Sequence, residues 1–377
     1  MSEFRRFADD HLQDLLSCVT AFVELESPST DKAALDRAGQ FLADRFARDL
    51  AARVQWFPVT DQGDHFAARV GNGHRQILLL GHHDTVWPVG TIDRMPCRVE
   101  GDRLTGPGVY DMKGGTIQAL FALQAVQALG LGKDKTFVFL GNADEEIGSH
   151  TSRQVIEELA QASECVLVLE PGAGVRGAAK LWRKGVGAYR LKVQGVASHA
   201  GGAPEKGRSA LLELAHQIID LQALNDFDQG VNVNVGVASG GTRSNVIPAQ
   251  AEARVDLRVP DMAAYAGVHS RIVSRPTFVD GTSVEITGGI NRPPMNETPE
   301  SRRIYEKAAA AAAAEGFDLP VGGAGGGSDG NFTAALGVPT LDGLGAVGSG
   351  AHADYEHVLV STIAPRVAWL ARFLADL

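Results

Sequence analysis

The sequence predicts an α/β protein whose mostly parallel central sheet is interrupted by a second, smaller α+β domain. Three short apolar runs lack polar alternation, as expected for strands that helices cover on both faces. From Gly185 the strand-like segments alternate apolar with polar residues, which is typical of a sheet with one solvated face. The α/β pattern of the first segment resumes after Asn291. We therefore expect one domain, residues 1–184 and 289–377, to be split by another, residues 185–288.

Periodicity predicts the elements of the first domain. Apolar residues recur at helical spacing over residues 31–50, which predicts an amphipathic helix packed on the sheet. Buried strands are expected at residues 77–80, 136–140 and 166–169. The crossover helices between them are expected at residues 116–129 and 151–161. Thr298 followed by Pro299 begins a further helix, which the alanine run at 308–314 extends.

The inserted segment has a different order of elements. Strands alternate with helices as strand, helix, strand, strand, helix, strand, which predicts a ferredoxin-like fold. These elements are expected at residues 189–193, 209–224, 231–237, 249–259, 261–274 and 284–287.

Composition excludes several classes of protein. The chain has 377 residues, 44% of them hydrophobic and 21% charged, which is enough to build a large core and excludes disorder and coiled coil. A formal net charge of −10, spread along the chain, argues against nucleic-acid and membrane partners. No apolar run approaches a bilayer span and the N-terminus does not read as a secretory signal, so we expect a cytoplasmic protein. The three cysteines are expected to be buried free thiols.

Side chains that bind metals follow each buried run. The carboxyl ends of parallel strands meet at one edge of a sheet, where open α/β sheets place their ligands. One further acid stands on a Gly-rich turn just ahead of a helix, and one further histidine follows a fourth apolar segment at 338–341. The candidates are His82, Asp84, Asp111, Glu145, Glu146, Glu170 and His352.

The convergence of these groups predicts a metal centre. Carboxylates and imidazoles brought to one rim would repel or stay protonated unless cations neutralise them. A dinuclear centre removes this difficulty. Oxygen and imidazole ligands without thiolates favour Zn²⁺, with Co²⁺ or Mn²⁺ as alternatives.

These motifs resemble a known family. The pattern His82-x-Asp84, Asp111 within GxGxxDxKGG, and the pair Glu145-Glu146 with Glu170 and His352 are similar to the M20-type co-catalytic zinc peptidases and deacylases. That family includes glutamate carboxypeptidase, whose branch is the most similar, acetylornithine deacetylase and succinyl-diaminopimelate desuccinylase. The resemblance covers nearly the whole chain and implies a zinc-exopeptidase catalytic domain with an inserted lid and dimerisation domain.

The resemblance also implies a role for each residue of the metal centre. Asp111 would bridge two metal ions, His82 and Glu170 would complete one ion, and the second ion would bind two further ligands. Those two ligands are Glu146 and His352. Asp84 would orient His82, and Glu145 would act as the general base that takes a proton from the attacking water.

Further roles fall on the inserted domain and on a glycine-rich segment. By resemblance, His199 would reach into the partner subunit of a homodimer and stabilise the oxyanion, while Asn245 and Arg258 would grip the substrate's free α-carboxylate. Ser328, in a GGxSDxN segment, would line the substrate pocket. The GxGxxG match in that segment has no leading strand, which argues against dinucleotide binding.

These observations predict a metal-dependent amide hydrolase. The expected reaction releases a C-terminal amino acid, with glutamate as the first choice, from an N-acyl, folate-like or short peptide substrate. An N-acyl-amino-acid deacylase is the alternative, because the carboxypeptidase branch often has Asp where this chain has Glu170. A non-catalytic binding module is a third interpretation. A serine or cysteine hydrolase is disfavoured because no GxSxG elbow is present.

Overall fold

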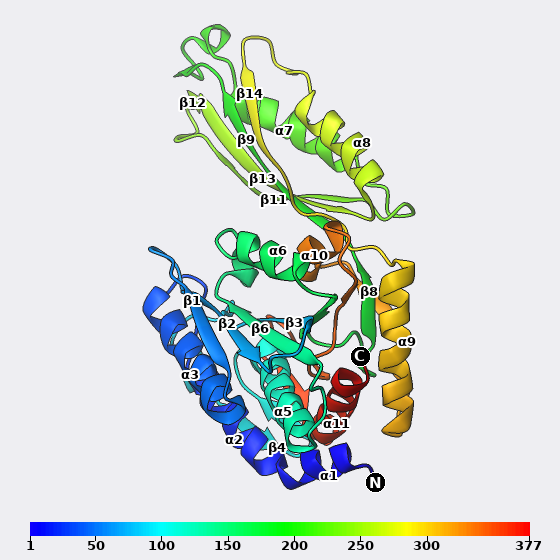
Figure 1. Ribbon diagram of the computed structural model, residues 1–377. Helices are drawn as coiled ribbons and strands as arrows, with labels where there is room; N and C mark the ends of the chain where they lie inside the picture. Colours follow the sequence, from blue (N-terminus) through cyan, green and yellow to red (C-terminus); the bar gives the residue numbers. More distant parts are fainter. The chain divides into compact units, whose positions relative to one another are not determined.

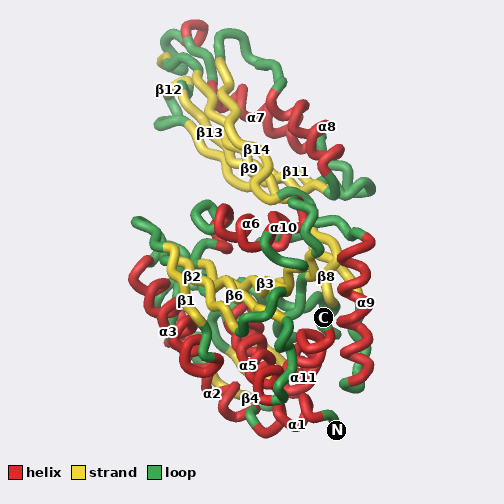
Figure 2. The backbone as a smooth tube through the Cα atoms, viewed as in Figure 1, coloured by secondary structure: helices red, strands yellow, loops and turns green.

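The computed structural model describes residues 1–377 as two compact units (Figures 1 and 2). The larger unit comprises residues 1–182, 296–324 and 328–377, and the inserted unit comprises residues 183–295 and 325–327. Arg183 and Met295 exchange backbone hydrogen bonds of 2.9 and 3.0 Å, which keeps residues 289–295 with the inserted unit. The second boundary therefore lies after Met295, whereas the sequence pattern placed it after residue 288.

The central sheet of the larger unit has six strands. In spatial order they are β1 (Arg53–Phe57), β2 (His65–Val70), β6 (Lys135–Asn142), β3 (Arg75–His82), β7 (Cys165–Val168) and β16 (Thr340–Leu341). β6, β3, β7 and β16 are parallel, whereas β1 and β2 add an antiparallel edge that periodicity did not predict. The prediction of an α/β fold with a mostly parallel sheet is confirmed.

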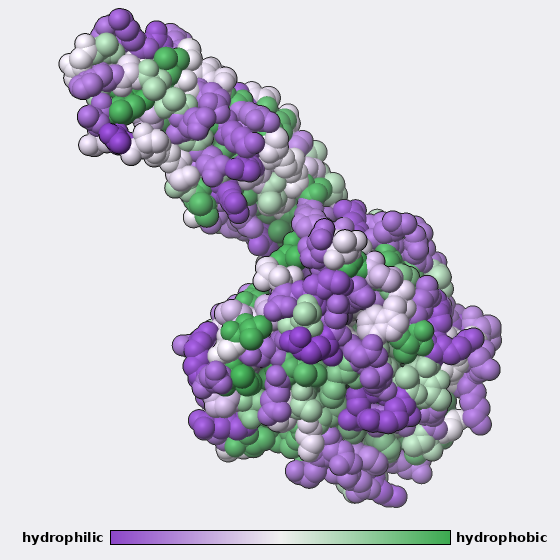
Figure 3. All heavy atoms as spheres, turned by 90° about the vertical axis from the view of Figure 1, so that its left-hand side faces the viewer, coloured by the Kyte–Doolittle hydropathy of each residue, from purple (hydrophilic) through white to green (hydrophobic).

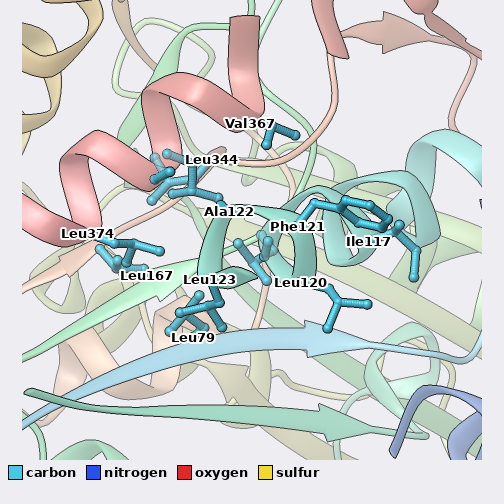
Figure 4. Close-up of a cluster of buried hydrophobic side chains, with 14 of the residues drawn as sticks. Leu79, Ile117, Leu120, Phe121, Ala122, Leu123, Leu167, Leu344, Val367 and Leu374 are labelled. Atoms are coloured by element: carbon cyan, nitrogen blue, oxygen red, sulfur yellow. The ribbon is translucent and has the colours of Figure 1, made fainter. Parts of the chain in front are cut away.

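Helices cover both faces of this sheet, and β3 shows how its side chains divide between them. Ile77 and Leu79 point into one core and Leu78 and Leu80 into another, and all four are at most 2% exposed. The first core lies against α5 (Gly114–Ala128) and α11 (Val360–Asp376), as Figure 4 shows around Leu79. The second lies against α6 (Arg153–Gln161) and α10 (Gly330–Ala335). Burial on both faces explains the continuous apolar runs.

The larger unit has five further helices, and three of them begin at side-chain caps. Asp31 accepts a hydrogen bond from Ala34 N–H at 3.0 Å at the start of the third helix, and Thr298 forms a capping box with Ser301. The five helices are α1 (Glu3–Asp10), α2 (Leu12–Glu24), α3 (Lys32–Leu50), α4 (Thr91–Arg94) and α9 (Pro299–Ala314).

The inserted unit is a four-stranded antiparallel sheet with two helices on one face. Its strands, in spatial order, are β11 (Asn232–Gly240), β13 (Gln250–Val259), β9 (Gly185–Gln194) and β14 (Ser283–Arg292), and its helices are α7 (Ala210–Gln222) and α8 (Met262–Val273). Alternate residues of β9, including Tyr189, Leu191 and Val193, are buried under the helices. The chain order of these elements confirms the ferredoxin-like prediction.

Short strands complete the structure. One small sheet in the larger unit places β17 (Gly348–Ser349), β18 (His357–Leu359), β5 (Arg103–Thr105) and β4 (Arg98–Glu100) side by side. The other pairs are β15 (Val321–Ala324) with β8 (Ala179–Arg183), and β10 (Ser198–His199) with β12 (Val246–Ile247). On the face in Figure 3, polar residues predominate on each unit. None of the helices is both long and apolar enough to span a bilayer.

Candidate metal centre

The candidate ligands meet at the carboxyl edge of the central sheet. His82 is the last residue of β3, Glu145 and Glu146 follow β6, and Glu170 follows β7. Parallel neighbours end at the same edge, so the order of strands alone brings these groups together. Two more candidate ligands come from loops that adjoin β5 and β18, which are paired strands of the small sheet. Asp111 follows β5 and His352 precedes β18.

Asp111 lies between the two histidines. His82 Nε2 is 3.5 Å from Asp111 Oδ1, and His352 Nε2 is 3.4 Å from Asp111 Oδ2. Each histidine also faces one more carboxylate: His82 Nε2 is 3.6 Å from Glu170 Oε1, and His352 Nε2 is 3.2 Å from Glu146 Oε2. The site therefore consists of two ligand groups that share one carboxylate.

These separations fit metal ligation better than direct hydrogen bonding. Zinc bonds of about 2.0 to 2.2 Å in a tetrahedron place neighbouring ligand atoms roughly 3.3 to 3.6 Å apart. The buried atoms His82 Nε2, Asp111 Oδ1 and Glu146 Oε1 have no hydrogen-bond partner. Such atoms are costly unless something else satisfies them. A pair of divalent cations would satisfy all three, so these residues fit the predicted metal group.

The pKa shifts of the candidate ligands also favour bound cations. The facing carboxylates of Asp111 and Glu146 raise the pKa of His352 to about 10, and burial raises the pKa of Glu146 to about 7. Burial opposes ionisation of Asp111 as well, but the facing imidazoles of His352 and His82 outweigh it and lower the pKa of this carboxyl. Protons held on the histidines thus compensate the carboxylates, and divalent cations can take over that role.

Asp84 organises both sides of the centre from a fully buried position. Its carboxylate accepts hydrogen bonds from Ser29 Oγ at 2.7 Å, from Glu145 N–H at 3.2 Å and from Glu146 N–H at 3.1 Å. His82 Nδ1 lies 2.9 Å from the Asp84 backbone oxygen and 3.4 Å from Asp84 Oδ1. Since Nδ1 donates in this direction, the neutral imidazole of His82 carries its lone pair on Nε2, which faces Asp111 and Glu170.

Glu145 lies beside the candidate metal ligands. One carboxylate oxygen of Glu145 lies within 4.8 Å of the ligand atoms of His82 and Glu170. Its neighbour Glu146 instead joins a group with His82 and Asp111. The two adjacent acids therefore point to different parts of the centre, which leaves room for different roles.

His199 is exposed in the inserted unit, and its tautomer follows from its contacts. The ring Nδ1 accepts hydrogen bonds from Gly201 N–H at 3.1 Å and from Gly202 N–H at 3.0 Å. A ring nitrogen that accepts two N–H groups carries no proton, so the proton of the neutral imidazole is on Nε2. The Gly-rich loop thus presents His199 as a hydrogen-bond donor.

Asn245 and Arg258 do not lie together within one chain. Arg258 pairs with Val186 near one end of the inserted sheet. Asn245 precedes β12 near the other end, where Gln250 begins β13. Eight residues of extended strand separate Arg258 from Gln250, roughly 26 Å at about 3.3 Å per residue. One chain alone therefore does not bring these two residues to one carboxylate.

Arg292 is a further candidate for binding a substrate carboxylate, and the sequence pattern did not indicate it. Val186 pairs with Arg258 on one side and with Arg292 on the other, so both arginines occupy the same row of the sheet. A shift in the pairing of β14 between Ile290 and Arg292 places Arg292 in this row, and strict alternation does not show such a bulge. A Cβ added to Gly327 would lie 2.8 Å from Arg292 Cδ, which explains the glycine there.

Ser328 and Asp329 hold a loop of the larger unit. Ser328 is fully buried, and its hydroxyl donates to Asp342 Oδ2 at 2.6 Å, so it does not face an open pocket. Asp329 accepts hydrogen bonds from Asn142 Nδ2 and from Ser149 Oγ, the latter at 2.5 Å. It also lines a small cavity together with residues of the metal centre. The Gly-rich segment thus adjoins the site through Asp329.

The family model described as peptidase family M20/M25/M40 matches residues 78–376. The chain belongs to this family. As a member it is a metal-dependent hydrolase of amide bonds.

Individual relatives agree with this assignment. Carboxypeptidase G2 from Pseudomonas sp. (strain RS-16) is 31% identical over 98% of this chain and 91% of its own length. Acetylornithine deacetylase from Klebsiella pneumoniae (strain 342) is 29% identical over 66% of this chain and 68% of its own length. The M20 metallo-carboxypeptidase Sso-CP2 from Sulfolobus solfataricus superposes with a TM-score of 0.78 at 19% identity, covering 96% of this chain and 98% of that chain, and so shares the fold.

Metal removal provides a test of the centre. Stripping the ions with a chelator should leave the crowded carboxylates to be compensated by protons. At free zinc a thousand times the dissociation constant, we expect each zinc ion to add about 4 kcal/mol to the free energy of unfolding. Thermal unfolding with and without zinc measures this difference. An unchanged unfolding midpoint across the zinc titration would contradict a metal centre at these residues.

Proposed function

We propose that this protein is a zinc-dependent exopeptidase that releases a C-terminal amino acid, with glutamate as the preferred leaving group, from N-acyl, folate-like or short peptide substrates. The observation that carries the proposal is the placement of the two Asp111 oxygens against two different histidines, 3.5 and 3.4 Å away. This arrangement supports two ions sharing one carboxylate. The similarity to carboxypeptidase G2 over nearly the whole chain supports the choice of reaction.

The residues of the centre divide into ligands and a base. We assign Asp111 as the ligand that both ions share. His82 and Glu170 would bind one ion, and Glu146 and His352 would bind the other. When bound, the two ions would polarise the amide carbonyl and lower the pKa of a water molecule.

Glu145 is the proposed general base. Its carboxylate lies beside ligands of the centre, and its backbone N–H is held by Asp84. It would take a proton from the attacking water and deliver it to the departing amine. Glu146, with its own oxygen 3.2 Å from His352, is the less suitable base because it is engaged as a ligand.

The inserted unit would supply substrate recognition and oxyanion binding. Arg258 and Arg292 lie in one row of its sheet, and guanidinium groups suit bidentate binding of a free carboxylate. Arg258 is now held by Asp256 through bonds of 2.8 and 2.9 Å, which a substrate carboxylate would replace. His199, with its proton on Nε2, would donate to the oxyanion of a partner subunit in a homodimer.

Asn245 belongs with His199 in this scheme. The two lie beside each other, because Ala200 N–H donates to the Asn245 backbone oxygen at 3.0 Å and His199 pairs with Val246. Both would therefore act on the partner's substrate, whereas Arg258 would act from the far end of the sheet. This division accounts for the separation of Asn245 from Arg258.

A deacylase of N-acyl amino acids is the second candidate function. The similarity to acetylornithine deacetylase and the presence of Glu170 favour it. A substrate panel separates the two. We expect kcat/KM to be highest for benzoyl-glutamate, and at least about tenfold lower for its α-carboxamide because a charge-assisted hydrogen bond is lost. Faster hydrolysis of N-acetyl-ornithine or succinyl-diaminopimelate would favour the deacylase.

Substitution of the base tests the mechanism. Glu145→Gln should lower kcat by at least about 100-fold because no group remains to take the proton, while zinc content stays near two ions per chain. Metal analysis and steady-state kinetics measure the two quantities. Glu158→Gln, an acid on α6, is the matched control and should leave both unchanged. Turnover retained in Glu145→Gln would refute the assignment of the base.

Subunit mixing tests the role of His199 in the partner's site. Glu145→Gln and His199→Ala should each be nearly inactive alone. In a heterodimer of the two, one site receives an intact Glu145 and an intact His199. Random exchange should therefore restore about a quarter of the wild-type rate, measured after the mixed proteins have re-equilibrated. No recovery despite demonstrated subunit exchange would show that His199 does not act across subunits.

A further inference from the structure

Glu356 is a buried carboxylate on which four N–H groups converge. Its Oε1 accepts hydrogen bonds from Tyr110 N–H at 2.8 Å and Asp111 N–H at 3.0 Å, and its Oε2 accepts them from Gly108 N–H at 2.9 Å and Trp87 Nε1–H at 2.8 Å. The residue has no exposed surface. A carboxylate is costly to bury, and these four donors are what offset that cost.

Three of the four donors belong to the turn that carries Asp111. Gly108 has a φ of +74°, and this turn directs the N–H groups of residues 108, 110 and 111 to the same acceptor. The backbone of Asp111 is therefore fixed by Glu356, whereas its side chain extends toward His82 and His352. Without the carboxylate, three N–H groups would lose their shared partner and the turn would lose its shape.

Glu356 also links the segments that carry the two histidines, through its fourth donor, Trp87, and through its own position in the chain. Trp87 follows closely after His82 and Asp84, and Glu356 follows four residues after His352. Glu356 also stands just before β18, which pairs with β5 ahead of the Asp111 turn. One carboxylate thus ties together the segments that carry His82, Asp111 and His352.

We infer that Glu356 is a positioning residue of the metal centre: it holds Asp111 at the point where both of its oxygens can serve the two ions. The inference rests on the proposed metal-dependent function and adds a residue to it. Glu356 touches neither substrate nor the reacting atoms. Its effect passes through the bridging carboxylate, so its loss should weaken metal binding before it affects substrate binding.

Glu356→Gln tests this inference. The amide replaces one acceptor oxygen by an NH₂ group that faces N–H donors. We expect the zinc dissociation constant of the metal-stripped protein to rise 10- to 100-fold, measured by competition with a chromophoric chelator. We also expect kcat at limiting zinc to fall while KM stays unchanged. Glu356→Asp, which keeps the charge on a shorter side chain, should recover part of the affinity.

The control is a second buried carboxylate of the same kind. Glu213 in α7 is fully buried and accepts hydrogen bonds from Phe278 N–H at 2.8 Å and Val279 N–H at 2.7 Å, within the inserted unit. Glu213→Gln should lower thermal stability but leave zinc affinity unchanged. If both Gln variants lower stability equally and bind zinc like the wild type, Glu356 has only a structural role and the inference is overturned.

Two further outcomes are distinguishable. If Glu356→Gln does not fold, Trp87→Phe removes one donor while keeping the aromatic packing, and unchanged zinc affinity in both Trp87→Phe and Glu356→Asp overturns the inference. If the wild-type protein binds no zinc, the proposed function itself fails. If the wild type binds zinc and hydrolyses its substrate, and Glu356→Gln binds zinc equally tightly, only the role of Glu356 fails.

Discussion

Mutual repulsion among buried carboxylates is the constraint on which this structure depends. Asp111, Glu146 and Glu170 have side chains that are 15%, 7% and 11% exposed, and Asp84 is completely buried. Carboxylates this close in a site of low polarity cannot all stay ionised without positive charge between them. The two histidines provide that charge only when protonated. Divalent cations are the stable solution, and the sheet, the loops and the buried acids can be understood as the means of holding them.

Support for the ligands spreads outward through backbone groups more than through other side chains. Asp84 binds the N–H groups of Glu145 and Glu146, and Glu356 binds those of the turn around Asp111. Arg366, which is also buried, donates to the backbone oxygens of Gly343 and Gly345 in the loop after β16. Buried charged side chains thus hold the backbone of the loops that carry the candidate ligands.

The sequence predicted those features that local patterns encode. Continuous apolar runs indicated the buried strands, and a strand end fixes where the next residues emerge, so His82, Glu145 and Glu170 could be placed at one edge. The antiparallel strands β1 and β2 escaped notice because neither contains the continuous apolar run that marks the other strands. Ser328 was expected at the pocket, whereas its hydroxyl turns to Asp342, a partner that spacing does not reveal. The four donors to Glu356 likewise come from residues far away in the chain. Arg292 was missed because a bulge breaks the alternation.

The interruption of the larger unit has a consequence for how the protein acquires its metal. His82 and His352 stand near opposite ends of the chain, and the whole inserted unit is synthesised between Glu170 and His352. Bringing these ligands together requires closing a very long loop, whose entropic cost is repaid only once the surrounding helices have packed. A nascent chain lacks His352 until most of the sequence has been synthesised, so the complete ligand set of the centre forms late.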